Sequence, residues 1–237
     1  MNVYTYETAD VANDAAAEVL AQWLADKDVR NVMVAAGNTP LDLYRRIAER
    51  KLSLGHLVVF ALDDYVGVPL DDSRNCANLL RCAVAEAWHV KEFHAVSSLE
   101  SDALRSVQEH EQRIRKAGGL DIIILGLGQN GHVGFNEPGS TADSVGRVVD
   151  LDSVSIEANR KWFAGKYAPA RGVTVGLRTI LAADRVMLLA YGAHKSAAVT
   201  DMVHGAASSD CPASFLQEHP DTHVFLDEAA AAGLEAT

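Results

Sequence analysis

An imidazole and a carboxylate lie five residues apart in a glycine-rich segment of the sequence. The segment 120–140 reads LDIIILGLGQNGHVGFNEPGS, and it places His132 and Glu137 shortly after an apolar run. A histidine has an ordinary pKa of about 6.5 and can take up or release protons near neutral pH. A neighbouring carboxylate can orient the ring and stabilise its charged form. The pair therefore predicts proton transfer to and from a bound ligand.

The same segment contains the pattern G-x-G-x-x-G, which also occurs in dinucleotide-binding proteins. Gly126, Gly128 and Gly131 match this pattern, and Asp150 follows about twenty residues later, as such a site requires. A dinucleotide site also needs a helix that begins inside the glycine run. Here two further glycines and a proline follow, which is unfavourable for a helix. The sequence therefore favours a functional loop over a nicotinamide or flavin site.

Apolar runs alternate with amphipathic segments along the chain, and this alternation predicts an α/β fold. We expect a doubly wound, mostly parallel sheet with helices on both faces, a Rossmann-like arrangement, in a single domain over residues 1–237. The predicted strands are 31–36, 56–62, 121–125, 185–191 and 222–226, and the predicted helices are 10–26, 41–50, 78–89, 102–118 and 195–205.

The carboxyl ends of the predicted strands are the places to look for a site, because ligands of such sheets bind there. Most of these ends have groups that could perform chemistry or hold an anion. The residues that follow the five strands are Gly37-Asn38-Thr39, Asp63-Asp64, Gly126 to Glu137, Gly192 to Lys195, and Asp227-Glu228.

A helix start follows the first predicted strand. Thr39 is expected to be the N-cap and Pro40 the first helical residue, which is a strong start signal. The free N–H groups and the positive end of the helix dipole suit a phosphate. The residues alone are equally consistent with simple capping, so both interpretations stay open.

Composition and charge exclude several classes of protein. The chain has 237 residues and a formal net charge of −11, which argues against a nucleic-acid partner. Its three cysteines form no C-x-x-C pair, and no His/Cys cluster has zinc-ligand spacing. No signal peptide and no run of about 18 apolar residues is visible. We predict a cytoplasmic protein with no metal and no membrane partner.

Six segments of the sequence resemble the glucosamine-6-phosphate deaminase (isomerase) family, in the order and at the spacing of that family. The resemblance extends from about Val32 to Asp227, and GHVGFNEPGS is its most specific part. The related 6-phosphogluconolactonases share the fold and the glycine–histidine turn but typically lack the F-N-E-P continuation. The matching segments are AAGNTPLDLY, FALDDYVGVP, GLGQNGHVGFNEPGS, TVGLRTIL, GAHKSAAV and LQEHP.

The resemblance implies an activity without metal or organic cofactor. An amino-sugar 6-phosphate, above all D-glucosamine 6-phosphate, would become the ketose 6-phosphate and ammonia. Asp63 would be the base that moves a proton from C2 to C1, and His132 with Glu137 would open the sugar ring. Many family members have aspartate where this sequence has Asn130, and an amide can only orient its neighbours.

The resemblance also implies a set of substrate and phosphate ligands. Lys161 stands where the family has an arginine, so the charge is kept but the bidentate fork is lost, and Arg160 stands beside it. Arg178 stands where the family commonly has glycine, and it could contact phosphate or point outward. The implied ligands are Gly37, Asn38, Thr39, Gly131, Lys161 and Lys195.

Two other activities stay open at this point. A sugar-lactone phosphate hydrolase would use His132 as a base and would not need Asp63. A non-catalytic sugar-phosphate sensor would explain the departures at Asn130, Lys161 and Arg178. For all three activities the expected partner is a small sugar phosphate, and the expected state is a monomer or a small homo-oligomer.

Overall fold

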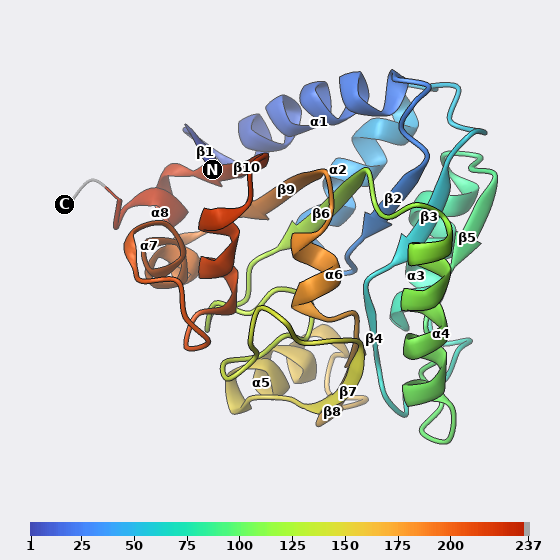
Figure 1. The fold of residues 1–237 in the computed structure, drawn as a ribbon. Coiled ribbons are helices and arrows are strands. Elements are labelled where there is room, and N and C mark those ends of the chain that lie inside the picture. Colours follow the sequence, from blue (N-terminus) through green and yellow to red (C-terminus); the bar gives the residue numbers. More distant parts are fainter. Residues whose placement is uncertain (235–237) are drawn as a thin grey trace.

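A parallel sheet forms the centre of the protein in the computed structural model, which describes residues 1–234 (Figure 1). In the described residues this sheet has seven strands, and each neighbouring pair is parallel. The predicted doubly wound α/β fold is confirmed. The strands are, in spatial order, β1 (Asn2–Tyr6), β10 (Thr222–Asp227), β9 (Arg185–Ala190), β6 (Ile122–Gly126), β2 (Asn31–Val34), β3 (Val58–Ala61) and β5 (Glu92–His94).

Helices cover both faces of this sheet, because successive side chains of each strand point to opposite sides. On β2, Val32 and Val34 belong to one buried cluster, whereas Met33 belongs to the other. The first cluster includes residues of α1 (Ala9–Ala25), α2 (Asn38–Glu49) and α3 (Cys76–Leu80). The second includes residues of α4 (Ala103–Lys116), α6 (Leu177–Leu181), α7 (Ser196–His204) and α8 (Glu228–Ala231).

A second, antiparallel sheet lies at the carboxyl end of the main sheet (Figure 1). It consists of β4 (Asp63–Tyr65), β8 (Arg171–Thr174) and β7 (Arg147–Asp150), and α5 (Ser153–Trp162) lies beside it. The sequence analysis predicted neither this sheet nor α5. Strands of three or four residues are too short to show a clear alternation of apolar and polar positions.

The other differences concern short elements and boundaries. Predicted helix 78–89 begins earlier, as α3, and continues as a π-helical segment η1 (Arg81–Glu86). The edge strands β1 and β5 were not predicted, since both are short and largely exposed or half-buried. Two 3₁₀ segments, η2 (Ala193–Lys195) and η3 (Pro212–Glu218), flank α7.

The chain changes direction across the sheet between β2 and β6. These strands are neighbours, but the chain leaves β2 toward β3 and later leaves β6 toward β9, on the opposite side. A crevice forms at the carboxyl ends of two such strands. The buried hydroxyl of Tyr44 donates a hydrogen bond to the carbonyl oxygen of Ala35 at 2.9 Å, and this bond anchors α2 beside the crevice.

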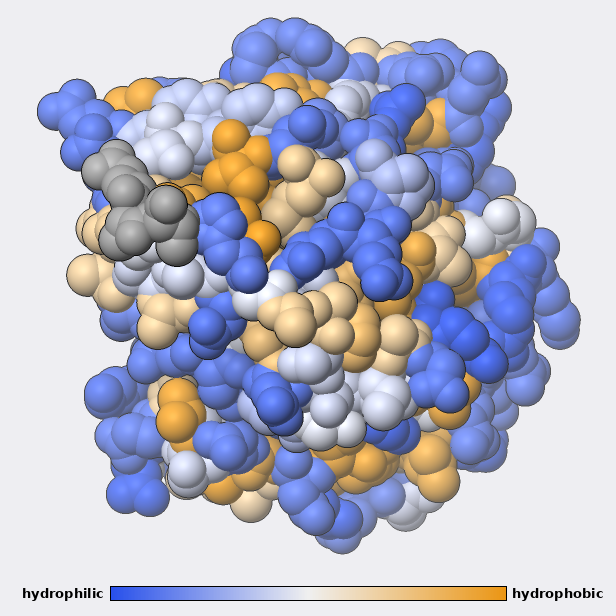
Figure 2. Space-filling view, turned by 60° about the vertical axis from the view of Figure 1, so that its left-hand side comes forward, coloured by the Kyte–Doolittle hydropathy of each residue, from blue (hydrophilic) through white to orange (hydrophobic). Residues whose placement is uncertain are grey.

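The surface is mainly hydrophilic on the face that Figure 2 shows, with small groups of apolar residues in between. This agrees with the high content of acidic residues, 32 Asp and Glu against 21 Lys and Arg. Within residues 1–234, none of the helices is both long enough and apolar enough to cross a membrane.

The turn before α6 tolerates no side chain at Gly176. A Cβ atom there would lie 2.1 Å from the carbonyl oxygen of Ser144 and 2.5 Å from the Cα of Val145. Because these are backbone atoms, we expect Gly176→Ala to lower the free energy of unfolding by about 1–3 kcal/mol, measured by urea denaturation. Gly55→Ala is the control, since its nearest contact would be an ordinary 3.6 Å. An equal loss in both variants would contradict the steric explanation.

Candidate active site

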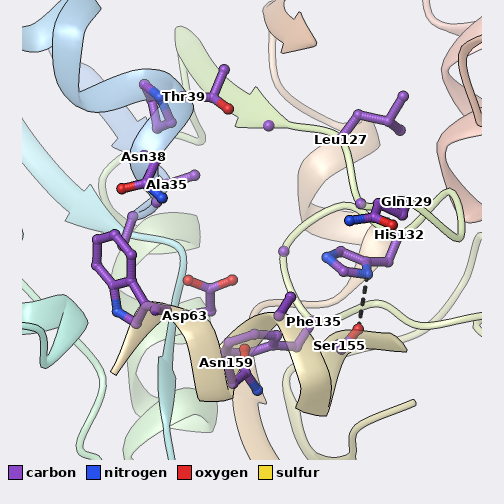
Figure 3. A pocket seen from close by; sticks show the side chains of 18 of the residues that line it. Ala35, Asn38, Thr39, Asp63, Leu127, Gln129, His132, Phe135, Ser155 and Asn159 are labelled. Atoms are coloured by element: carbon purple, nitrogen blue, oxygen red, sulfur yellow. Dashed lines mark hydrogen bonds between the residues drawn. The ribbon is translucent and has the colours of Figure 1, made fainter. Parts of the chain in front are cut away.

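A cavity of about 420 Å³ opens at the carboxyl ends of β2, β3, β6 and β9 (Figure 3). This volume is typical of a site for a small molecule. The side chains of Asp63, His132 and Lys195 line it, together with the first turn of α2. Three of the strand ends that the sequence analysis singled out, those of β3, β6 and β9, therefore supply the ionisable groups of the cavity. The end of β2 leads into the first turn of α2. The fifth strand end, Asp227, instead accepts hydrogen bonds from the N–H groups of Gly192 and Ala230.

The pleat of β4 separates the two adjacent aspartates. Asp63 points into the cavity (Figure 3), where no hydrogen-bond partner for its carboxylate is found among the described residues. Asp64 points away and accepts hydrogen bonds from the N–H groups of Tyr65, Cys76 and Ala77. Asp64 thus anchors the start of α3, and Asp63 alone is available for chemistry.

Burial and charge make Asp63 an unusually weak acid. Removal from water, followed by the negative charge of Asp64, raises the pKa of Asp63 to about 8. Burial also raises the pKa of Asp64, to about 6, although its three backbone hydrogen bonds oppose this effect. The ionised form is therefore disfavoured more strongly at Asp63 than at Asp64. When it loses its proton, Asp63 becomes a stronger base than an ordinary aspartate.

The amide of Asn130 fixes the orientation of His132. A carboxylate only accepts hydrogen bonds, so the amide nitrogen of Asn130 donates to Oε2 of Glu137 at 2.7 Å. The amide oxygen then faces Nδ1 of His132, also at 2.7 Å. An amide oxygen only accepts, so Nδ1 has the hydrogen. The other ring nitrogen, Nε2, points into the cavity (Figure 3), where it is the acceptor of the neutral imidazole.

Glu137 lies behind His132 rather than in the lining of the cavity. Its Oε2 is 3.3 Å from Nδ1 of the imidazole. Burial raises the pKa of Glu137, but hydrogen bonds and charge from His132, with hydrogen bonds from Ser155 and Asn130, outweigh it and lower the pKa to about 2. Glu137 is therefore ionised at neutral pH, and its charge stabilises the imidazolium form of His132.

The glycines of the G-x-G-x-x-G pattern make room for this network. A Cβ at Gly128 would lie 2.3 Å from Nδ1 of His132, so the imidazole occupies that space. A Cβ at Gly131, which has a φ of +80°, would lie 2.6 Å from Sγ of Cys211. Gly131, an expected ligand, does not line the cavity and instead shapes the loop. No helix begins between β6 and β7.

Helix α2 presents its N-terminus to the cavity, but not as the sequence predicted. The helix begins at Asn38, and Gly37 is the N-cap with a φ of +130°, so Thr39 is not the cap. Gly37 has no side chain that could accept a hydrogen bond, and Pro40 has no N–H. The N–H groups of Asn38 and Thr39 consequently have no partner among the described residues, and all four residues line the cavity.

Lys195 lines the same cavity as this helix start. Its ammonium donates a hydrogen bond to the carbonyl oxygen of Leu127 at 2.6 Å, which holds the side chain across the ends of β9 and β6. Burial lowers the pKa of Lys195 from its ordinary value. A cation and a helix N-terminus together form a place for an anion.

Lys161 and Arg178 lie elsewhere. Lys161 is 78% exposed on α5, pairs weakly with Glu157 at 4.0 Å, and faces a neighbouring hollow instead of the cavity. Arg178 is exposed and does not line the cavity, so it points outward. Among the described residues, no three His, Cys, Asp or Glu side chains form a group that could hold a metal ion.

Helix α5 supplies site residues that the sequence analysis missed. Ser155 and Asn159 line the cavity, and Asn159 accepts a hydrogen bond from the hydroxyl of Tyr65 at 2.8 Å. The carboxylate of Asp152 caps this helix by accepting from the N–H of Val154. That aspartate was the available sequence signal, but the segment lacks a strong apolar stripe.

The fold and the cavity define a class of protein: an α/β protein with a buried carboxyl group, an oriented imidazole and a helix N-terminus in one crevice. The model of the family described as glucosamine-6-phosphate isomerases/6-phosphogluconolactonase matches residues 5–225. The chain belongs to this family, as the resemblance of its motifs predicted.

Relatives with known names match nearly the whole chain. The glucosamine-6-phosphate deaminase of Corynebacterium kroppenstedtii is 37% identical over 243 residues, covering 99% of this chain and 93% of the relative. That of Cutibacterium acnes is 39% identical over 226 residues, covering 92% and 87%. A solved monomeric glucosamine-6-phosphate deaminase has a TM-score of 0.92 at 30% identity, covering 98% and 100%. A Thermotoga maritima 6-phosphogluconolactonase, at 23% identity and a TM-score of 0.74 over 95% and 99%, shows the shared fold alone.

The two hydrogen bonds of Asn130 can be separated by mutation. Asn130→Ala removes both, and we expect kcat to fall about 10–100-fold because the imidazole loses its fixed orientation. Asn130→Asp keeps the acceptor for Nδ1–H but places a second carboxylate against Glu137. At lower pH the new carboxylate and that of Glu137 share a proton, which replaces the N–H donor of the lost amide. The activity of Asn130→Asp relative to the native protein should therefore rise as the pH is lowered from about 8 to about 6. Equal, pH-independent losses in both variants would contradict this role.

Proposed function

We propose that the protein converts D-glucosamine 6-phosphate and water to D-fructose 6-phosphate and ammonia. The observation that carries the proposal is that the Asp63 carboxylate and Nε2 of His132 face the same cavity from different strand ends. The names of the relatives that match nearly the whole chain support the same activity.

The phosphate of the sugar binds at the start of α2. The N–H groups of Asn38 and Thr39, which have no partner among the described residues, and the ammonium of Lys195 supply three donors to the same cavity. Such donors favour a dianion through both hydrogen bonds and the helix dipole. Anchoring there directs the sugar toward Asp63 and His132, which fixes the reacting atoms before any bond changes.

His132 opens the sugar ring. Its Nε2 takes the proton from the hydroxyl on C1, and the same nitrogen returns a proton to the ring oxygen as the bond from C1 to that oxygen breaks. The imidazolium formed in between is stabilised by the ionised Glu137, 3.3 Å from Nδ1. The product of this step is the open-chain aldehyde with its amino group on C2.

Asp63 then shifts the double bond. Its carboxylate removes the proton from C2 while the aldehyde oxygen takes a proton from the ammonium group on C2, which gives an enolamine with a hydroxyl on C1. The proton is then returned to C1, which gives a protonated imine at C2. Water adds to this imine, and ammonia leaves as the ketone forms. A buried base whose pKa is raised to about 8 is suited to remove a weakly acidic carbon-bound proton.

Asp63→Asn tests the central step. We expect ammonia release to fall by about 10³-fold or more, since Asp63 is the one carboxylate among the described residues that line the cavity, while binding of glucosamine 6-phosphate, measured by calorimetry, persists. Asp71→Asn, at an exposed position on the neighbouring loop, is the control and should keep its activity. Turnover by Asp63→Asn close to the native rate would remove Asp63 from its role. Hydrolysis of 6-phosphogluconolactone instead of ammonia release would replace the proposed reaction.

The same variant gives a test in the absence of substrate. The folded-state pKa of Asp63 is raised above its unfolded value, so the folded protein binds this proton more tightly. Stability therefore falls as the pH rises from about 4 to about 8. Asp63→Asn should lack this contribution and melt at a higher temperature than the native protein at pH 8, with a smaller difference at pH 4. An unchanged melting temperature at both values would contradict the buried, unpaired carboxylate.

The phosphate position is tested by two lysine variants. Lys195→Met removes a cation in the cavity, and we expect KM to rise about 10–100-fold with a smaller effect on kcat. Lys161→Met removes an exposed cation outside the cavity, and KM should change less than about twofold. The reverse order of effects would place the phosphate in the neighbouring hollow beside α5.

Two further properties concern the assembly and the location of the protein. We propose a monomer, since the solved deaminase that superimposes on nearly the whole chain is monomeric. We propose a cytoplasmic location because Cys76, Cys82 and Cys211 are free, as in reducing compartments. Gel filtration and fractionation of the cells that make the protein are the direct measurements.

A further inference from the structure

Ser155 reaches the catalytic network from a different element. It lies on the first turn of α5, its residue is only 4% exposed, and it lines the cavity. Its hydroxyl oxygen lies 3.3 Å from Nδ1 of His132, as the dashed line in Figure 3 marks. No motif of the sequence singled it out.

The hydrogen of this hydroxyl can be placed by elimination. Nδ1 of His132 already has a hydrogen, which it donates to Asn130, so Ser155 cannot donate to Nδ1. Glu137 has one carboxylate oxygen, Oε1, that is buried and without a partner among the described residues. An unpaired buried carboxylate oxygen is costly. The hydroxyl of Ser155, which lies 3.3 Å from Nδ1 of His132, also lowers the pKa of Glu137 through a hydrogen bond, so the Glu137 carboxylate is the acceptor for its hydrogen.

We propose that Ser155 is a positioning residue for His132: its hydroxyl donates to the carboxylate of Glu137 and presents its oxygen to Nδ1–H, which fixes the imidazole against α5. This inference deepens the proposed function, because Ser155 acts through His132 in ring opening.

The arrangement links the cavity wall to the proton-transfer group. Val154, Ala158 and Trp162 of α5 also line the cavity, so a bound sugar contacts the same helix that holds the imidazole. Nδ1–H of His132 then faces three oxygen atoms: Asn130 Oδ1 at 2.7 Å, and Glu137 Oε2 and Ser155 Oγ at 3.3 Å each. Two acceptors from the glycine-rich loop and one from α5 leave one orientation of the ring, with Nε2 toward the substrate.

The first test uses no substrate. In protein labelled with ¹⁵N-histidine, the Nδ1–H signal of His132, assigned by its loss in His132→Gln, should be sharp in the native protein. Ser155→Ala should shift or broaden it, because one acceptor and the donor to Glu137 are lost. Ser153→Ala is the matched control on the same turn, where the hydroxyl is exposed, and its spectrum should equal the native one.

The second test uses glucosamine 6-phosphate. Ser155→Ala should lower kcat about tenfold with little change in KM, as expected for the loss of a hydrogen bond to a charged group. Ser155→Thr keeps the hydroxyl and should recover most of the loss. An unchanged Nδ1–H signal in folded Ser155→Ala, or an unchanged kcat, overturns the inference. Absence of ammonia release from the native protein would instead overturn the proposed function, and the imidazole signal would still decide the role of Ser155.

Discussion

A carboxyl group buried without a hydrogen-bond partner is the constraint on which the site depends. Asp63 lies next to a second buried aspartate, and two charges this close in a dry environment cannot both be ionised without cost. Asp64 accepts hydrogen bonds from three backbone N–H groups, whereas the carboxyl group of Asp63 has no such donor within residues 1–234. Because β4 alternates its side chains, the unpaired group faces the cavity. Burial of the Asp63 carboxylate without a hydrogen-bond donor within residues 1–234 thus raises its pKa and makes it a stronger base than an ordinary aspartate.

Much of this arrangement follows from the sequence. The central strands were predicted, because buried parallel strands are continuous apolar runs bounded by turn residues. Their order in the chain places the residues after β2, β3, β6 and β9 at one edge, so Asp63, His132 and Lys195 meet in one cavity. The glycine run was correctly separated from a dinucleotide site, since the residues after Gly131 do not favour a helix. In the structure, the imidazole of His132 occupies the space that a side chain at Gly128 would need.

The rest depends on contacts that no local pattern encodes. Thr39-Pro40 looks like a helix start, yet Gly37 can adopt a positive φ and is the N-cap, so the helix begins two residues earlier than predicted. Lys161 matches a family position but lies outside the cavity, because the direction of a side chain on α5 is set by tertiary packing. Ser155 contacts His132 only because α5 packs against the glycine-rich loop. The two residues are more than twenty positions apart in the sequence, so no local pattern indicates the contact.

The amide at position 130 limits where a proton can travel. An ionisable side chain in its place could carry a proton from the ring onward, but an amide holds its hydrogens at neutral pH and conducts none. Glu137, with its pKa near 2, is too acidic to keep a proton that the imidazole could hold. A proton therefore cannot pass from the imidazole of His132 into the protein interior through Asn130 or Glu137. Whatever proton His132 accepts through the cavity must leave through the cavity, so the sugar's own hydroxyl hydrogen is the natural one to be delivered to the ring oxygen.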